Sequence, residues 1–302
     1  MKKIIVLAAV AAMLPVSLMA QTAPDGGLSP EVLSRISKGY TGTSYDKAVR
    51  NALAGSSVNV MATNAENASM IDTHFSDRVK TKGITDQKSS GRCWLFTGLN
   101  VLRAKMIEKY NLGSFTFSQN YLFFYDQLEK ANLFLQGVID TRKLPFDDRK
   151  VDWLFSNPLS DGGQFTGVSD LAMKYGLVPS EVMPETYSSN NTSQMALQLK
   201  TILRQGGLAL RAAYDASPAA SAKGKNAAAA EAKVNAGLLK IKEAVLTDVY
   251  RILSLCLGVP PTSFEWSMYD SSDKLVSTEE YTPLSFYKKY VDEDLDGNYV
   301  ML

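Results

Sequence analysis

Apolar residues recur at helical spacing in the middle of the chain. From Cys93 to about Tyr110 they stand four, three and four positions apart, so they share one face of a predicted helix. These residues are Leu95, Leu99, Leu102 and Met106. Ser89 and Ser90 are candidate caps before this helix, and Gly113 is expected to end it.

The same kind of pattern predicts two further helices and one strand. One helix is predicted from Gln119 to about Leu135, with Ser118 as its cap. The residues that share one face of the other helix are Val245, Val249, Ile252 and Cys256. The apolar residues that alternate with polar ones, as in a strand, are Phe264, Trp266 and Met268.

Two segments have the composition of connections rather than of a core. Residues 21–71 are rich in Ser, Gly, Asn, Ala and Thr, which predicts a leader or flexible arm. Residues 211–236 are dominated by Ala, Lys and Ser, which predicts an exposed helical insertion or a variable connection. Residues 72–302 are then expected to form the main domain.

Residues 1–20 have the pattern of a secretory signal peptide. Lys2 and Lys3 precede the apolar stretch Ile4–Leu14, and Ala20 provides a small residue for cleavage. The alternative is a membrane anchor, but the apolar stretch is short for a bilayer and Pro15 interrupts its end. We therefore expect export to the periplasm or the exterior of a bacterial cell, without a stable membrane anchor.

Composition excludes several classes of function. The 302 residues include 32 basic and 31 acidic ones, and this net charge of +1 gives no electrostatic case for nucleic-acid binding. Cys93 and Cys256 are too far apart in sequence for a disulfide framework and match no zinc spacing. The single histidine, His74, excludes a site built from several imidazoles, so no metal site is predicted from this composition.

The segment before the first predicted helix places a cysteine where it would be reactive. A thiol is a good nucleophile only when ionised, and the unpaired N–H groups of a helix N-terminus favour the thiolate. Cys93 stands at this position, six residues after Gln87. The Gln87 side-chain amide and the Cys93 N–H are then expected to donate together to an oxyanion. The alternative is that Cys93 is a small buried apolar residue.

The residues around Cys93 resemble the nucleophile motif of the papain superfamily, in which glutamine and a short turn precede glycine, one residue, cysteine and tryptophan. The closer resemblance is to the bleomycin hydrolase/aminopeptidase C family, and it extends in family order from about Phe75 to the end. The matching segments are Gln87–Phe96, Ser118–Phe124, Asp161–Gln164, Lys174–Pro179, Leu257–Pro261 and Thr282–Tyr287.

This resemblance implies an α+β papain-like cysteine peptidase fold with a helical insertion, here without the C-terminal sheet-rich half. It implies a broad-specificity aminopeptidase that acts on peptide substrates and needs no metal or other cofactor. Cys93 would be the nucleophile and Gln87 the oxyanion donor, whereas Gly162, Gly163 and Trp94 would bind the substrate. A homo-hexamer, and a C-terminal arm that restricts cleavage to peptide N-termini, are expected of full-length members.

Thiol hydrolysis also needs an imidazole to protonate the leaving amine, and the papain-like order places histidine and asparagine after the cysteine. No histidine follows Cys93 here, and we interpret His74 as a structural or surface residue. Two hypotheses follow. One is a cysteine aminopeptidase represented by an incomplete chain, which the strand-like ending Asn298–Leu302 favours; the other is a non-catalytic binding or scaffold protein. In either case we expect these 302 residues alone to be inactive by the usual mechanism.

An acidic segment near the end resembles the opening of a calcium-binding loop. Asp292, Asp294 and Asp296 stand at the first, third and fifth positions, and Gly297 stands at the sixth. An acidic turn is the favoured interpretation, because no paired flanking helices are evident. Calcium binding is kept as the alternative.

Overall fold

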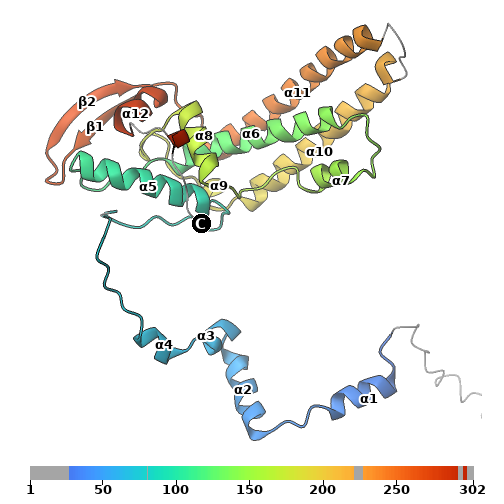
Figure 1. Ribbon diagram of the computed structural model, residues 1–302, viewed down its shortest axis with the longest axis vertical. Helices are drawn as coiled ribbons and strands as arrows, with labels where there is room; N and C mark the ends of the chain where they lie inside the picture. Colours follow the sequence, from blue (N-terminus) through green and yellow to red (C-terminus); the bar gives the residue numbers. More distant parts are fainter. Residues whose placement is uncertain (1–26, 80, 221–226, 292–294, 298–302) are drawn as a thin grey trace, which may run out of the picture. The chain divides into compact units, whose positions relative to one another are not determined.

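The computed structural model describes residues 27–79, 81–220, 227–291 and 295–297. Internal contacts divide the chain into two units, one up to Ser76 and one from Asp77 onward. The predicted signal peptide, residues 1–20, lies outside the described residues. Each unit has its own set of elements (Figure 1).

The described part of the first unit forms short helices that are held by local hydrogen bonds. They are α1 (Pro30–Lys38), α2 (Ser44–Gly55), α3 (Val58–Ala62) and α4 (Ala65–Ser69). The side chains that accept a backbone N–H of each first turn are Ser29, Thr43, Ser57 and Asn64. No residue of α1, α2 or α3 is buried, so capping and not a core accounts for these helices.

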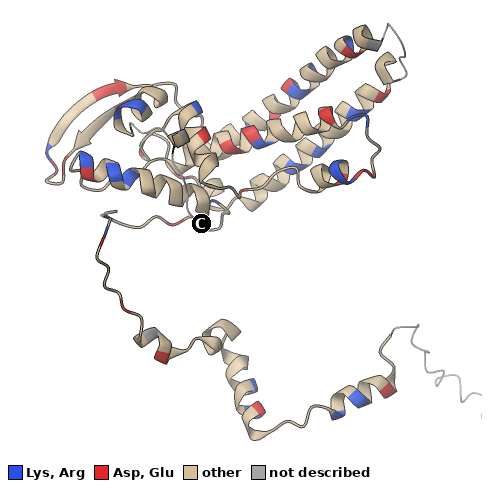
Figure 2. Cartoon of the chain, in the orientation of Figure 1, with Lys and Arg blue, Asp and Glu red and all other residues tan. Residues whose placement is uncertain are grey.

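Long helices form the body of the second unit. They are α5 (Cys93–Lys109), α6 (Gln119–Asp140), α8 (Phe165–Tyr175), α10 (Ser193–Asp215) and α11 (Ala227–Leu257). The shorter helices are α7 (Arg149–Ser156) and α9 (Tyr187–Asn190). α10 and α11 pack against each other and along α6 (Figure 1). Charges of both signs are interspersed over these helices (Figure 2). Among the described residues, no helix is both long and apolar enough to cross a membrane.

One hydrophobic core runs through α5, α6, α8, α10 and α11 and continues to the C-terminal part of the second unit. The face predicted for α5 is buried, with Leu95, Leu99, Leu102 and Met106 between 0% and 3% exposed. At the start of α6, the buried Asn120 amide donates to the carbonyl oxygens of Pro184 at 2.8 Å and Leu257 at 2.7 Å. These bonds hold the start of α6 against the end of α11.

The second unit also contains a two-stranded antiparallel sheet. β1 (Phe264–Tyr269) pairs with β2 (Leu275–Tyr281), and the first residue of β1 lies opposite the last residue of β2. α12 (Pro283–Tyr290) follows and packs against the inner face of β1. There the ring centroids of Trp266 and Phe286 are 5.2 Å apart. An aromatic cluster therefore joins the sheet to the helical core.

The helix predicted at Cys93 is confirmed, but its predicted caps are wrong. Arg92 occupies the cap position and makes no side-chain capping bond. Ser89 and Ser90 are instead bonded within the preceding loop and to a distant segment. The helix ends one turn before Gly113. Long-range contacts of this loop, which local propensity cannot reveal, decide how the helix begins.

The other predicted elements are confirmed with longer bounds. The Ser118 hydroxyl accepts the Tyr121 N–H at 3.0 Å and caps α6 as expected. The third predicted helix lies within α11, and the predicted strand is β1. Residues 211–236 divide between the end of α10, a 3-10 turn at Pro218–Ala220 and the start of α11, with 221–226 outside the described residues. The second strand and α12 were not predicted; β2 lacks a buried alternating face.

Gly176 permits a close contact between two distant segments. It follows α8 with a φ of +80°, and a Cβ placed on it would lie 2.2 Å from the backbone carbon of Pro283. The next residue, Leu177, donates its N–H to the Pro283 carbonyl at 3.1 Å. Only glycine satisfies both the left-handed backbone and the contact.

We therefore expect Gly176→Ala to lower the free energy of unfolding by about 3 kcal/mol, because a methyl group would strain the backbone and collide with another backbone. Urea denaturation measures this loss. Gly237→Ala is the matched control, since Gly237 lies in α11 with no atom within 4 Å of its added Cβ. The control should gain about 0.5–1 kcal/mol. Equal stability of both variants would contradict the role of Gly176.

Candidate active site

Cys93 is the first residue of α5, and it is exposed. The buried residues that follow it, Leu95 at 0% and Leu99 at 1% exposure, fix the helix in the core. The N–H groups of Leu95 and Phe96 bond the Arg92 carbonyl, so the helical ladder starts immediately after the thiol. The N–H of a first helical residue has no acceptor within its helix and is left for another partner. The sulfur thus lies at the positive end of a rigid helix.

A fully buried cation precedes the thiol. The Arg92 guanidinium donates to both carboxylate oxygens of Glu185, at 3.0 and 2.8 Å, and to the Ser90 hydroxyl at 3.0 Å. The guanidinium also lies over the rings of Phe96 and Phe123, 5.0 and 5.1 Å from their centroids. The buried Arg92 side chain therefore holds the turn before Cys93 in place through its bonds to Ser90 and Glu185. The sequence reasoning missed this pair, because nothing local indicates that Glu185 is its partner.

Gln87 lies in the turn that leads to Cys93. Its side-chain amide donates to the Ser90 carbonyl at 2.7 Å, and the Ser90 hydroxyl donates to the Gln87 carbonyl at 2.7 Å. Lys88, inside this turn, has a φ of +53°. A primary amide has two N–H donors, and the bond to Ser90 uses one of them. The side chain is half-buried and held in place, as an oxyanion donor must be.

Asp161 joins the predicted glycine segment to the nucleophile loop. Its carbonyl accepts the Trp94 indole N–H at 2.7 Å. Its carboxylate accepts the Gly91 N–H at 3.2 Å and the Thr192 hydroxyl at 2.5 Å. Residues some 70 positions apart are thereby brought together, and Gly162 and Gly163 follow directly. We call Ser160–Gly163 the glycine strip.

The two glycines of the strip have different surroundings. A Cβ on Gly163 would lie 2.6 Å from Trp94 Cε2, inside the indole ring's contact distance. A Cβ on Gly162 would meet only Ser160 Oγ at 3.8 Å. Both glycines are exposed, whereas Trp94 is only 8% exposed. The structure thus gives Trp94 a packing role against Gly163. Substrate binding by Gly162, Gly163 and Trp94 stays a prediction.

Lys130 and Asp126 of α6 lie behind the strip. The Lys130 ammonium bonds Asp126 Oδ2 at 2.8 Å, the Ser160 carbonyl at 3.0 Å and the Gly162 carbonyl at 2.7 Å. Burial raises the pKa of Asp126 from 3.8 to about 6, opposed by the charge of Lys130 and by hydrogen bonds from Lys130 and Gln127. This charged pair was not expected from the sequence, where both residues look like part of a polar helix face.

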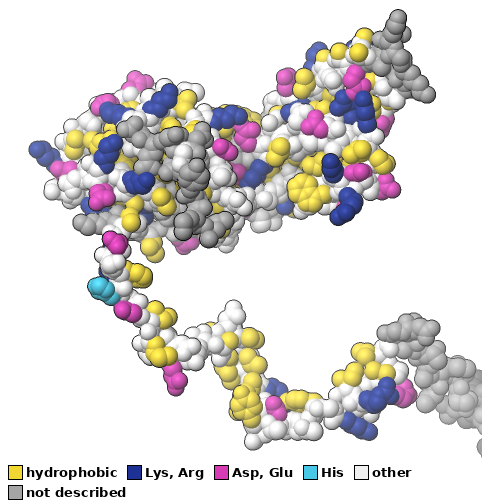
Figure 3. All heavy atoms as spheres, in the orientation of Figure 1, with side chains coloured by type: hydrophobic (Ala, Val, Ile, Leu, Met, Phe, Trp, Pro, Cys, Tyr) yellow, Lys and Arg dark blue, Asp and Glu magenta, His cyan; other side chains and the backbone are white. Residues whose placement is uncertain are grey.

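The remaining candidate residues belong to other segments of the chain. His74 is exposed and belongs to the first unit; Figure 3 shows the histidine in cyan. Cys256 is half-buried on α11 and packs against the core. Asp292 and Asp294, and the side chain of Asp296, lie outside the described residues. Within the described ranges, no group of three His, Cys, Asp or Glu side chains could hold a metal ion.

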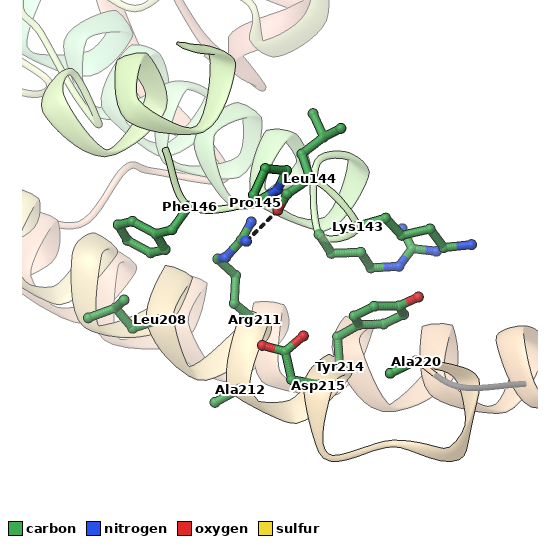
Figure 4. Close-up of a pocket in the computed structure, with 11 residues that line it drawn as sticks. Lys143, Leu144, Pro145, Phe146, Leu208, Arg211, Ala212, Tyr214, Asp215 and Ala220 are labelled. Carbon is green, nitrogen blue, oxygen red and sulfur yellow. Dashed lines mark hydrogen bonds between the residues drawn. The ribbon is translucent and has the colours of Figure 1, made fainter. Parts of the chain in front are cut away.

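A pocket of about 800 Å³ opens beyond the C-terminal end of α6 (Figure 4). Arg211 reaches across it and donates to the Leu144 carbonyl at 2.6 Å. Arg142 donates to the Ile139 carbonyl at 2.6 Å and pairs with Glu231. Both guanidinium groups thus bind acceptors of the chain itself, so we interpret them as residues that stabilise the fold. No residue of the Cys93 loop lines this pocket.

The chain is similar to known peptidases. The model of the peptidase C1-like family matches residues 27–302. The chain belongs to this family. Aminopeptidase C of Lactobacillus delbrueckii subsp. lactis is 40% identical over 230 residues, which are 76% of this chain and 48% of that protein. Aminopeptidase G of the same organism is 36% identical over 275 residues, or 91% of this chain and 59% of that protein.

A solved structure is similar as well. The crystal structure of PepW from Lactobacillus rhamnosis HN001 matches with a TM-score of 0.77 and 34% identity, over 90% of this chain and 58% of that one. The expected α+β papain-like fold of the bleomycin hydrolase type is therefore confirmed. The chain spans about half to three fifths of the length of these relatives.

We expect Gly163→Ala to lower the free energy of unfolding by about 1–3 kcal/mol, because its methyl group must displace the buried Trp94 ring. Gly162→Ala is the matched control and should change stability by less than about 0.5 kcal/mol, since its Cβ would make only an ordinary van der Waals contact with Ser160 Oγ. Urea denaturation of both variants measures the difference. Similar losses in the two variants would contradict the packing described.

Asp126 makes stability depend on pH. Because the pKa of Asp126 is raised in the folded state, the protonated carboxyl group favours the folded state. This contribution to the free energy of unfolding is fully present below about pH 4 and is lost as the pH rises through about 6. The wild type should therefore lose up to about 3 kcal/mol relative to Asp126→Asn between about pH 4 and pH 7. Chemical denaturation across this range measures the change.

Asp86→Asn is the control of opposite sign. The hydrogen bond with Lys88 lowers the pKa of Asp86, so this group stabilises the fold above its ordinary pKa and loses that effect as the pH falls. A pH trend of the same sign for both variants would contradict the assignment.

Proposed function

We propose that this chain provides the nucleophile and oxyanion site of a cysteine aminopeptidase that hydrolyses peptides at their N-termini. The observation that carries the proposal is an exposed cysteine at the N-terminus of a buried helix, directly after a turn that holds Gln87. The names of the similar proteins, aminopeptidases C and G, support the same reaction class.

The proposed first step is attack by the Cys93 thiolate on the peptide carbonyl carbon. A sulfur–carbon bond forms, and the carbonyl electron pair moves to oxygen, where the Cys93 N–H and the free N–H of the Gln87 amide donate to the oxyanion. The carbon–nitrogen bond then breaks, and the amine leaves with a proton from a general acid. Water hydrolyses the thioester and regenerates the thiol.

The general acid of this reaction is expected to be a histidine that follows Cys93, and these 302 residues contain none there. The only histidine is His74, 19 positions before Cys93, and it is exposed in the first unit. The papain-like order places the imidazole that protonates the leaving amine after the cysteine, and no histidine follows Cys93 in these 302 residues. We therefore expect the chain by itself to react covalently at Cys93 without repeated turnover of peptides.

Two reagents test the proposal. We expect an epoxysuccinyl peptide to label Cys93 at least about tenfold faster than it labels a free cysteine peptide near neutral pH, because a helix N-terminus stabilises the thiolate. Mass spectrometry locates the label. Cys93→Ala should abolish this labelling, and Cys256→Ala, the matched control, should leave it unchanged. Hydrolysis of aminoacyl-amidomethylcoumarin is expected to stay at background.

Labelling of Cys93 at the rate of a free thiol would contradict the proposal. It would favour the non-catalytic binding or scaffold protein instead. Turnover of the fluorogenic substrate that depends on Cys93 would support the peptidase but contradict the expected lack of a general acid.

A further inference from the structure

We propose that Lys130 is a positioning residue that holds the glycine strip, Ser160–Gly163, in register with Cys93 for binding of a peptide backbone. This inference rests on the proposed function, and it adds to it a residue on α6 that lies outside the nucleophile loop. Three observations carry it: the bonds of the ammonium group, the bonds of the strip, and the contact between the strip and Trp94.

The ammonium group of Lys130 is fully used by acceptors of this chain. An ammonium has three N–H donors, and Asp126, Ser160 and Gly162 accept at 2.8, 3.0 and 2.7 Å. Two of these acceptors are main-chain carbonyls of the strip. Asp126 is only 8% exposed in its side chain and orients the ammonium from the α6 side. The Lys130 ammonium is therefore held between the Asp126 carboxylate on α6 and two carbonyls of the strip.

Three consecutive carbonyls of the strip are bound from behind. Ser160 accepts from Lys130 and from the Gln127 amide at 3.2 Å, Asp161 accepts from the Trp94 indole at 2.7 Å, and Gly162 accepts from Lys130. Among the described residues, none is hydrogen-bonded to the backbone of Gly163. An exposed glycine with unused N–H and carbonyl groups is the place where an extended peptide can pair with the strip.

The strip is coupled to the nucleophile through one side chain. Trp94 follows Cys93 directly, and its ring touches Gly163 and lies 5.4 Å from the Lys130 ammonium. A shift of the Gly162 carbonyl would therefore move the peptide-binding backbone relative to the sulfur. Displacements of about 1 Å between bound substrate and reacting group cost large factors in rate. Lys130 acts on the reaction through Gly162 and does not touch the substrate.

Lys174 provides a matched control. Both lysines line the same pocket of about 460 Å³ between α6 and α8. The Lys174 ammonium pairs with Glu129 on α6. Of these two lysines, only Lys130 is hydrogen-bonded to the strip. Replacement of either lysine by methionine removes one ammonium group from the pocket wall, but only Lys130→Met removes the hydrogen bond to the Gly162 carbonyl.

The experiment compares two labelling rates at Cys93 in the full chain. An epoxysuccinyl dipeptide must lie along the strip, whereas iodoacetamide needs only the sulfur. The measured ratio is the rate constant for the dipeptide reagent divided by that for iodoacetamide. We expect Lys130→Met to lower this ratio by about tenfold, because the strip loses two charge-assisted bonds. Lys130→Arg should restore at least half of the ratio on a logarithmic scale, and Lys174→Met should keep the wild-type ratio. Hydrogen exchange of peptides covering the strip should accelerate in Lys130→Met only.

The outcomes separate the two proposals. A wild type that the dipeptide reagent does not label would overturn the proposed function, and this inference with it. A labelled wild type whose ratio is the same in Lys130→Met would overturn the role of Lys130 alone. So would an equal loss in Lys174→Met, since the effect would then be general to the pocket wall. A lower ratio with iodoacetamide labelling and thermal stability retained supports the inference.

Discussion

A buried positive charge directly before the thiol is the constraint on which the candidate site depends. Arg92 is fully buried, and removing water from a guanidinium costs several kcal/mol unless its donors are matched. Both carboxylate oxygens of Glu185 and the Ser90 hydroxyl supply that match. Because Glu185 lies in a loop 93 positions away, the turn before Cys93 can adopt its conformation only when the second unit is folded.

The same constraint explains why the site consists of loops on a rigid base. α5 directs its apolar face inward and leaves Cys93 exposed at its first residue. Around it, Asp161 receives bonds from the nucleophile loop, and α6 supports the glycine strip from behind. Lys130 and Trp94 bind the backbone carbonyls on the inner side, whereas Gly162 and Gly163 are exposed. Membership of the peptidase C1-like family fits this arrangement.

Sequence reasoning was successful where the information is local. The spacing of Leu95, Leu99 and Met106 predicted α5, and the position of Ser118 predicted the start of α6. It failed where the partner is distant. Ser89 looked like a helix cap, but its backbone pairs with the segment around Asn191. β2 was missed because most of its side chains are exposed, so it has no apolar alternation to detect.

The sequence by itself determined the helix at Cys93, the turn between Gln87 and Cys93, and the family, because spacing and motif order are properties of neighbouring residues. The tertiary structure alone decided what holds these parts together. The Arg92–Glu185 pair, the bond from Trp94 to Asp161 and the bonds of Lys130 to the strip join residues 30 to 93 positions apart. No local preference selects such partners. They are selected once the core has closed, because a buried polar group without a partner costs free energy.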